Sequence, residues 1–170
     1  NLKGGLTIID SISTIIVMGL EEQYKKARDF VENKFSPRGS WSLFEFNIRY
    51  LGGLLSAYSL SHDSIFKDAA VGVGNTIQQA IKETGGFFSS TFRFSTSDKK
   101  LHQYEAKVRS ESVERSILAE AGTFQVEFFK LAEITDNDAY IKTATKVYKT
   151  LWKKYPNKGL ISTHIGAGKD

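Results

Sequence analysis

The chain has 170 residues, of which 41% are hydrophobic and 25% charged, with two prolines and no cysteine. This composition is typical of one globular domain and excludes disordered and low-complexity proteins, disulfides, thiolate metal sites and cysteine nucleophiles. The formal net charge of +4 is distributed among 19 acidic residues, so we expect no nucleic-acid partner. Because Asp10 and several hydroxyl residues interrupt the apolar stretch 6–20, we expect no membrane span there.

Apolar residues recur at helical spacing in the first half of the chain. One stripe over residues 16–31 predicts a single helix or two helices broken near Gly19. Two adjacent stripes over residues 43–58 predict a helix that is buried on most sides. A single stripe over residues 66–80 predicts a one-sided helix, which we expect to end at Gly85-Gly86 because glycine accepts a positive φ.

The second half contains one segment with a different period. Residues 86–96 alternate with period two and are rich in Phe and Thr, which predicts a short strand or hairpin. Residues 97–114 are polar and charged, and we expect a surface loop, with a partly helical segment as the alternative. Residues 117–131 predict a buried helix, and residues 140–151 a one-sided helix stopped near Tyr155-Pro156.

An internal repeat organises these helices. The segment Asp63-Ser-Ile-Phe-Lys-Asp-Ala aligns with Asp138-Ala-Tyr-Ile-Lys-Thr-Ala, and a segment starting at Glu21 fits the same template more loosely. Asp63 and Asp138 are predicted to cap their helices at the N-terminus. Each copy follows a more apolar helix, so the sequence predicts three stacked hairpins, each with a buried and an outer helix, in an all-α fold.

Two carboxylates occupy the same register of this repeat. Glu45 lies 18 residues before Asp63, and Glu120 lies 18 residues before Asp138, so we expect both on one concave surface. Their neighbours are apolar, and an ionised group in such surroundings is costly unless it is paired or protonated. A general acid requires this kind of environment.

Other interpretations of the polar residues remain open. Glu45 and Arg49 stand at i and i+4, where an ion pair alone would explain them, whereas Glu120 has no basic residue at i+3 or i+4. Asp10 is equally well explained as a helix cap. The three histidines lack ligand-like spacing and are expected on the surface, so no metal ligand is predicted in this chain: His62, His102 and His164.

Three ordered blocks resemble one known family. They are Leu6-Thr-Ile-Ile-Asp-Ser-Ile-Ser-Thr-Ile, Phe44-Glu-Phe-Asn-Ile-Arg-Tyr-Leu-Gly-Gly and Leu118-Ala-Glu-Ala-Gly-Thr-Phe-Gln-Val-Glu-Phe. Together they closely resemble the class I α-1,2-mannosidases of glycoside hydrolase family 47. The resemblance implies an (α/α)7 barrel, of which residues 1–170 would form part of the catalytic domain, as an arc of three of the seven hairpins with one short β-hairpin.

The resemblance also implies roles for individual residues. Glu45 matches the general acid of an inverting hydrolase, in which a second carboxylate activates water on the opposite face of the sugar. Arg49 matches an arginine that contacts the oligosaccharide, and Glu120 a carboxylate of the mannose subsite. Asp10, in the first block, is placed with the substrate-binding residues. The implied cofactor is Ca²⁺, the implied substrate a high-mannose N-glycan, and the implied location the endoplasmic reticulum or Golgi.

The chain departs from the family pattern at several points. Ser13 stands where the family usually has an acid, and the segment 104–115 is charged where the family is rich in Trp and Gly. The block with the second catalytic acid and the threonine that binds calcium are absent from the sequence. We therefore expect this chain alone to be inactive, with the rest of the barrel or self-association covering the arc. The alternative is a non-catalytic, lectin-like module that binds glycan or protein.

Overall fold

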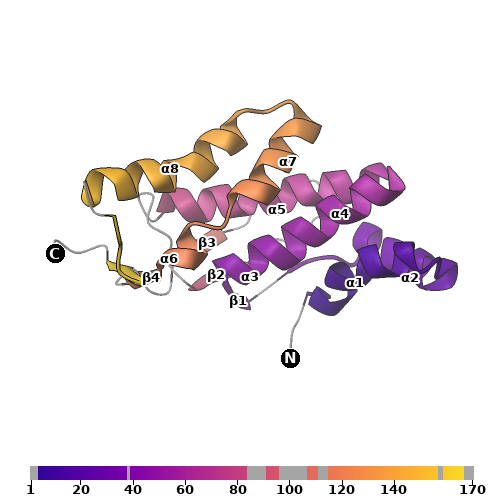
Figure 1. Ribbon diagram of the computed structural model, residues 1–170. Helices are drawn as coiled ribbons and strands as arrows, with labels where there is room; N and C mark the ends of the chain where they lie inside the picture. Colours follow the sequence, from indigo (N-terminus) through magenta and orange to yellow (C-terminus); the bar gives the residue numbers. More distant parts are fainter. Residues whose placement is uncertain are drawn as a thin grey trace.

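The computed structural model describes residues 4–37, 39–83, 91–95, 107–110, 115–156 and 159–166 (Figure 1). Helices form most of the described chain, and short strands lie beside them at one end. In chain order the helices are α1 (Leu6–Val17), α2 (Glu21–Asn33), α3 (Leu43–Glu45), the π-helix η1 (Phe46–Leu51), α4 (Gly52–Ser61), α5 (Ser64–Glu83), α6 (Leu118–Ala121), α7 (Gln125–Thr135) and α8 (Ala139–Lys154).

The long helices form three antiparallel hairpins in two layers. The first hairpin is α1 with α2, the second is α4 with α5, and the third is α7 with α8. In the inner layer α4 contacts both α1 and α7, and in the outer layer α5 contacts both α2 and α8. The predicted stack of inner and outer helices is therefore confirmed. No helix in the described ranges is long and apolar enough to cross a membrane.

Gly19 separates the two helices of the first hairpin. Its φ of 66° lies in the left-handed region, which favours glycine because a Cβ is strained there. The N–H groups of Gly19 and Leu20 donate to the last carbonyls of α1, those of Ile16 and Ile15. Of the two alternatives for residues 16–31, two helices broken near Gly19 is the correct one.

The inner helix of the second hairpin runs without a break from residue 43 to residue 61. It consists of α3, the π-helix η1 and α4, and it begins at Ser42, whose hydroxyl accepts a hydrogen bond of 3.3 Å from the Glu45 N–H. His62, with a φ of 56°, ends the helix and lies exposed at the turn to α5. The helix predicted over residues 43–58 is confirmed, whereas the π-helical turn was not predicted.

The third inner helix is shorter than its sequence stripe indicates. Ile117 lies in a strand, and residues 122–124 separate α6 from α7, so the predicted helix over 117–131 is wrong in its first half. The outer helix α8 ends at Lys154, as the Tyr155-Pro156 stop predicts. The stop predicted at Gly85-Gly86 lies outside the described residues, two positions after the end of α5.

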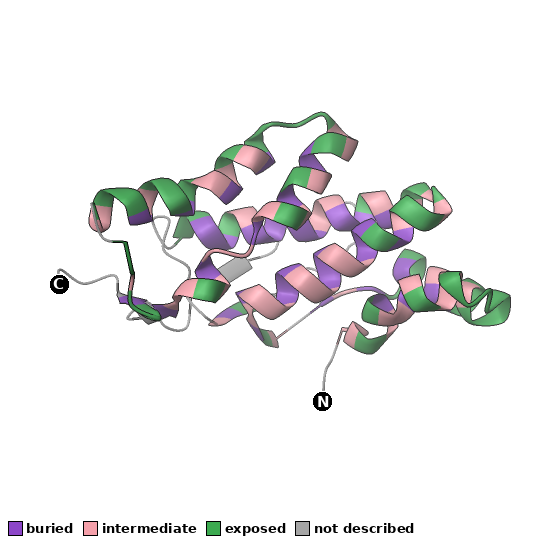
Figure 2. Cartoon of the chain, in the orientation of Figure 1, coloured by how far each residue is buried: buried purple, intermediate pink, exposed green. Residues whose placement is uncertain are grey.

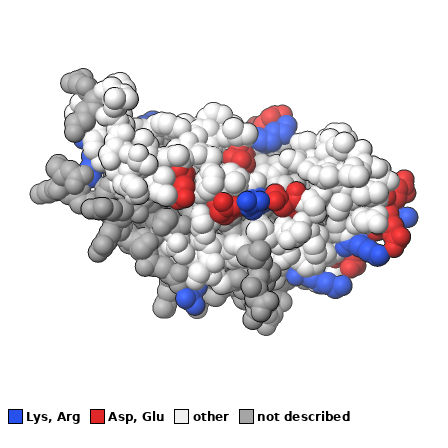
Figure 3. Space-filling model, turned by 60° about the horizontal axis from the view of Figure 1, so that its bottom comes forward, with Lys and Arg blue, Asp and Glu red and all other residues white. Residues whose placement is uncertain are grey.

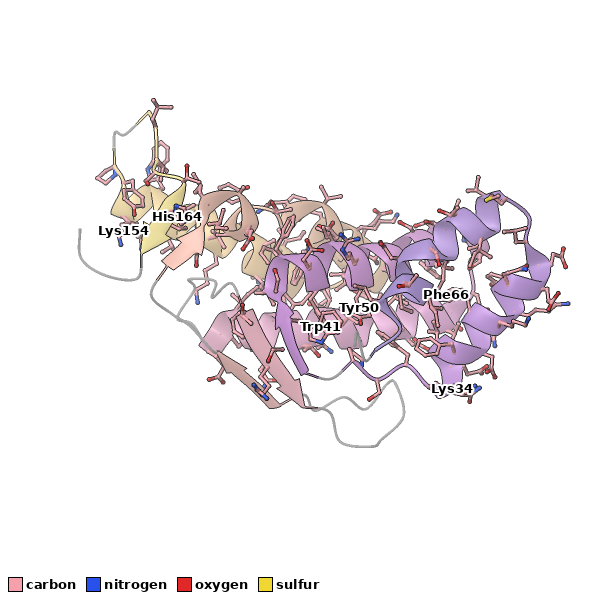
Figure 4. The ribbon with its side chains drawn as sticks, turned by 90° about the horizontal axis from the view of Figure 1, so that it is seen from below. Lys34, Trp41, Tyr50, Phe66, Lys154 and His164 are labelled. Atoms are coloured by element: carbon pink, nitrogen blue, oxygen red, sulfur yellow. The ribbon has the colours of Figure 1, made fainter. Side chains whose placement is uncertain are left out.

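The core lies between the two helix layers. In Figure 2 the buried residues of the inner and outer helices face each other, and the exposed residues follow the outer sides of α2 and α8. An aromatic cluster closes the core near the start of the second inner helix: Trp41 packs edge-on to Tyr50, with ring centroids 5.3 Å apart, and the two lie side by side in Figure 4. Burial raises the pKa of Tyr50.

Two small antiparallel sheets correct the sequence interpretation. The first contains β1 (Gly39–Ser42), β2 (Thr91–Ser95) and β3 (Lys107–Ser110), and the second contains β4 (Arg115–Ile117) and β5 (His164–Gly166). A strand in the segment 86–96 is confirmed over Thr91–Ser95, but it forms no hairpin within that segment, because its partners are β1 and β3. The surface loop expected over 97–114 is wrong at least for Lys107–Ser110.

The two predicted helix caps behave differently. Asp63 caps α5, since its Oδ1 accepts a hydrogen bond of 3.1 Å from the Ile65 N–H, and its Oδ2 accepts one of 2.6 Å from Arg28 Nε. At the equivalent position Asp138 makes no side-chain cap, and Asn137 accepts a hydrogen bond of 3.0 Å from the Ala139 N–H instead. The cap prediction is thus confirmed for Asp63 and wrong for Asp138.

This difference predicts a difference in stability. We expect Asp63→Ala to lower the free energy of unfolding by about 2 kcal/mol and Asp138→Ala by about 0.5 kcal/mol, because only Asp63 loses a cap and a charged partner. Burial opposes ionisation of Asp63, but the hydrogen bonds from Arg28 and the Ile65 N–H outweigh it and lower the pKa of Asp63. The contribution of Asp63 should therefore be complete above the unfolded-state pKa of about 3.9 and disappear as the pH falls below it.

Urea unfolding at neutral pH and at about pH 2 measures both effects. The difference in the free energy of unfolding between Asp63→Ala and the unmodified chain should become smaller at the lower pH. Equal losses for the two variants at neutral pH would contradict the assignment of the cap.

Candidate functional site

Glu45 lies at the junction between β1 and the second inner helix. It is the third residue of the helix, and its N–H is held by the Ser42 hydroxyl, so the junction fixes the direction in which the helix starts. The Glu45 carboxylate then accepts a hydrogen bond from Arg49 Nε, one turn later. The local ion pair read from the i, i+4 spacing is confirmed.

Arg49 also joins this helix to the first hairpin. Its Nη1 donates a hydrogen bond of 2.9 Å to Asp10 Oδ2, so Asp10, Arg49 and Glu45 form a charged row across α1 and the second inner helix. Asp10 lies inside α1, and its interpretation as a helix cap is therefore wrong. The hydrogen bonds to Glu45 and Asp10 raise the pKa of Arg49, which keeps the guanidinium charged.

The charged row faces solvent. The side chains of Glu45, Arg49 and Asp10 are 40%, 41% and 43% exposed. Figure 3 shows a short row of alternating acidic and basic side chains near the middle of this face, with uncharged residues directly around it. Solvent screens ion pairs at this exposure, so they contribute little to stability, and their position on an open surface leaves them accessible to a ligand.

An open depression of about 690 Å³ adjoins the row, between α1, β1 and the start of the second inner helix. Five hydroxyl residues and one aromatic residue line it together with the charged row, which suits a ligand rich in hydroxyl groups. The lining residues are Leu6, Thr7, Asp10, Ser11, Thr14, Ser40, Trp41, Ser42, Glu45 and Arg49.

A second depression of about 620 Å³ lies between α1, α4 and α7. Asp10 lines both depressions, and Ser13, one turn after Asp10, lines only this one. Ser13, which stands where the resemblance implies an acid, therefore faces an open depression. The lining residues are Asp10, Ser13, Ile48, Gly52, Gly53, Leu55, Ser56, Ser59, Leu60, Val126, Glu127 and Lys130.

The π-helical turn brings a further pair of polar residues together. Asn47 is buried, and its Nδ2 donates a hydrogen bond of 2.9 Å to Glu127 Oε2 on α7, while its Oδ1 has no partner in the described part of the chain. π-helical turns occur frequently at functional sites. Sequence reasoning missed both residues, although Glu127 follows Glu120 by seven residues, which is two helical turns.

Glu120 lies near the row but is not joined to it. It is partly exposed on α6, and α6 packs against α3, which carries Glu45. No hydrogen bond or ion pair connects the Glu120 side chain to another described residue. The structure thus brings Asp10, Glu45 and Arg49 into direct contact and places Glu120 on the adjacent short helix.

The described residues offer no site for the implied calcium ion. No group of three or more His, Asp or Glu side chains in the described ranges is arranged to hold a metal. His62 and His164 are exposed, as expected, and His102 lies outside the described residues. The resemblance places the calcium ligand in a block that this sequence does not contain.

Comparisons with known proteins give consistent results. A family model described as glycosyl hydrolase family 47 matches residues 1–169. Over 97% of this chain, the sequence is 33% identical to a mannosyl-oligosaccharide 1,2-alpha-mannosidase of Caenorhabditis elegans. Over 86% of this chain, it is 34% identical to an endoplasmic reticulum mannosyl-oligosaccharide 1,2-alpha-mannosidase of Schizosaccharomyces pombe.

A solved structure confirms the fold. The alpha-1,2-mannosidase from Trichoderma reesei superposes on 95% of this chain with a TM-score of 0.73 and 25% sequence identity. This likeness confirms helical hairpins of the (α/α)7 barrel type. The chain spans 28% and 27% of the length of the two curated relatives and 36% of the solved structure.

Proposed function

The chain belongs to glycosyl hydrolase family 47, and on this premise we propose that residues 1–170 form part of the catalytic domain of an α-1,2-mannosidase. The observation that carries the proposal is the row Asp10, Arg49 and Glu45 beside a depression lined with hydroxyl groups. Its relatives are named as enzymes that act on mannosyl-oligosaccharides, so we propose high-mannose N-glycans as the substrate.

In the proposed reaction Glu45 is the general acid. It donates a proton to the departing glycosidic oxygen, and a carboxylate from elsewhere in the barrel activates water on the opposite face of the sugar. Such an inverting pair is about 6.5–9.5 Å apart, which leaves room for the water.

Arg49 and Asp10 position the acid in this proposal. Arg49 donates to the Glu45 carboxyl and is itself held by Asp10 from α1, so the orientation of Glu45 depends on both hairpins. The second Nη of Arg49 makes no hydrogen bond to another described residue and is available to donate to a sugar hydroxyl. We place Glu120, on the adjacent α6, in the mannose subsite.

The location and the cofactor are further parts of the proposal. One relative is named as an endoplasmic reticulum enzyme, which supports the secretory pathway, in the endoplasmic reticulum or Golgi, as the place of action. We propose glycoprotein quality control as the role. A calcium ion would bind sugar hydroxyls as a hard cation. We assign none of its ligands to the described residues, which form no carboxylate cluster.

The competing function is glycan binding without hydrolysis. The observation that favours it is Ser13, which faces the second depression and provides a hydroxyl where the family usually provides an acid. A module of this kind would retain high-mannose glycan without releasing mannose.

Mannose release separates the two functions. The protein should be expressed from the full open reading frame that encodes this chain and incubated with α-1,2-linked and α-1,3-linked mannobiose. We expect release from the α-1,2-linked substrate and loss of release with a calcium chelator. Binding of high-mannose glycan without any release would favour the lectin-like function, and neither binding nor release would contradict both.

Ser13→Asp in the same protein should strengthen sugar binding. A carboxylate at this position can accept a charge-assisted hydrogen bond from a sugar hydroxyl, and we expect an affinity increase of about tenfold. The matched control is Ser64→Asp on the outer helix α5, which adds the same charge away from both depressions. Titration with mannobiose measures the sugar affinity of both variants. An unchanged affinity of Ser13→Asp would show that the serine at position 13 has no effect on sugar binding.

A further inference from the structure

The outer helix α8 carries a row of lysines on one side. Its sequence contains five lysines and no acidic residue. Lys142, Lys146, Lys149 and Lys153 follow one another at intervals of four, three and four residues, and all four are exposed. At 100° per residue they fall within a narrow strip of the helix surface, opposite the buried residues Tyr140, Ala144, Val147 and Leu151.

These lysines have no acidic partners in the described part of the chain. None of the four takes part in an ion pair there. The outer helix α2 behaves differently, because Lys26 pairs with Glu22 at 2.6 Å and Arg28 pairs with Glu32 at 2.7 Å. The five positive charges of α8 exceed the formal net charge of +4 of the whole chain. The excess charge of the protein is therefore gathered on one helix.

An exposed aromatic side chain borders the row. Trp152 lies one turn after Lys149, is adjacent to Lys153, and is 79% exposed. Tyr148, one turn before Trp152, is 48% exposed, with its hydroxyl donating to the Gly122 carbonyl. Tryptophan and lysine side by side are typical of helices that lie in a membrane interface, where the ring enters the headgroup region and lysines contact anionic lipid.

We propose that the outward face of α8 docks on an anionic lipid surface. Lys142 and Lys153, the first and last of the four, are 11 positions apart, about 16 Å along the outward side of a single helix. Lysines are flexible point charges, and an outward row of them suits a continuous anionic surface better than a ligand that requires forked hydrogen bonds. Trp152 distinguishes lipid from an acidic polypeptide, because only the lipid surface offers an apolar layer beneath the charges.

The proposed orientation leaves the charged row of the site open. α8 and α1 lie at opposite ends of the hairpin stack (Figure 1), and Asp10, Arg49 and Glu45 belong to the first and second inner helices. Docking through the outer side of α8 would therefore hold the protein near a membrane with the depression beside α1 accessible.

Vesicle binding tests the proposal with the 170-residue chain. Vesicles of phosphatidylcholine alone are compared with vesicles that contain about 30% phosphatidylserine, at low and high salt. We expect co-sedimentation only with the anionic vesicles, weakened by salt, and a blue shift of tryptophan emission. Trp152 is the source of this shift, because Trp41, the other tryptophan, is only 8% exposed.

Two variants with the same charge change provide the control. Lys142→Gln, Lys146→Gln, Lys149→Gln and Lys153→Gln together should weaken binding by about 10²–10³-fold, since each lysine near such a surface contributes about fivefold. The control is Lys25→Gln, Lys26→Gln, Lys34→Gln and Lys82→Gln together, which removes four exposed lysines from α2, the residue that follows α2, and α5. We expect the affinity of the control variant for anionic vesicles to fall by less than about tenfold. Trp152→Ser should abolish the blue shift of tryptophan emission.

Several outcomes would overturn the proposal. These are no binding to anionic vesicles at low salt, equal losses for the two quadruple variants, or binding to polyglutamate without binding to vesicles. Circular dichroism of each variant establishes that the helices are retained, so that a loss of binding can be assigned to the removed side chains.

Discussion

Replacing Glu45 with glutamine, in the protein expressed from its full open reading frame, should lower kcat for mannose release by about 10²–10⁴-fold with little loss of sugar binding. Glutamine keeps the length of the side chain and an oxygen that can accept the hydrogen bond from Arg49 Nε. It lacks the proton that a general acid transfers to the departing oxygen. The expected loss therefore falls on kcat rather than on KM.

A matched control is available on the outer helix α2. Glu22 forms an i, i+4 ion pair with Lys26, as Glu45 does with Arg49, but its side chain is 76% exposed and lines neither depression near the charged row. Glu22→Gln should leave kcat unchanged. Near-normal turnover of Glu45→Gln would exclude Glu45 as the acid, and mannose release by the 170-residue chain alone would contradict a site that needs a second carboxylate from elsewhere.

The second large effect concerns two adjacent glycines. A Cβ on Gly53 would lie 2.8 Å from the Ile9 carbonyl oxygen on α1 and 3.2 Å from Ile9 Cγ2, so the backbones of α1 and α4 would have to separate. A Cβ on Gly52 would meet Glu127 Cγ at 3.7 Å, an ordinary contact. We expect Gly53→Ala to lower the free energy of unfolding by about 2–3 kcal/mol.

Gly52→Ala should instead raise the free energy of unfolding. Alanine in a helix interior is favoured over glycine by about 0.5–1 kcal/mol, and nothing at position 52 opposes the methyl group. Urea unfolding of the two variants gives both values. If both substitutions stabilise the chain, the first two inner helices do not approach as closely as described. Because Ile9 precedes Asp10, Gly53→Ala should also disturb the hydrogen bond between Asp10 and Arg49.

The sequence predicted those features that depend on neighbours along the chain. Helical periodicity found the hairpin helices, the 18-residue register related Glu45 to Asp63, and the i, i+4 spacing found the pair Glu45 and Arg49. The Asp63 cap was found in the same way, because a cap acts on the N–H groups that follow it. At position 138 the same reasoning failed, since Asn137 provides an equivalent oxygen one residue earlier.

The features that were missed depend on contacts between distant segments. β1 has four residues, too few for a recognisable period, and it exists because β2, some 50 residues later, pairs with it. Asn47 and Glu127 are 80 positions apart, and Asp10 and Arg49 are 39 apart. Asp10 was placed with the substrate-binding residues through the family resemblance, while the residues around it left a helix cap equally open. The catalytic and binding roles of all four predicted residues stay predictions.

The layout of the hairpins sets how the site can come apart. Within the described residues, the first hairpin contacts the second mainly through α4, η1 and α5. Local separation of these two hairpins would remove Asp10 from Arg49, while Glu45 and Arg49 would stay on one helix. Such a separation breaks fewer contacts than global unfolding, so we expect the complete charged row to be lost more readily than the fold.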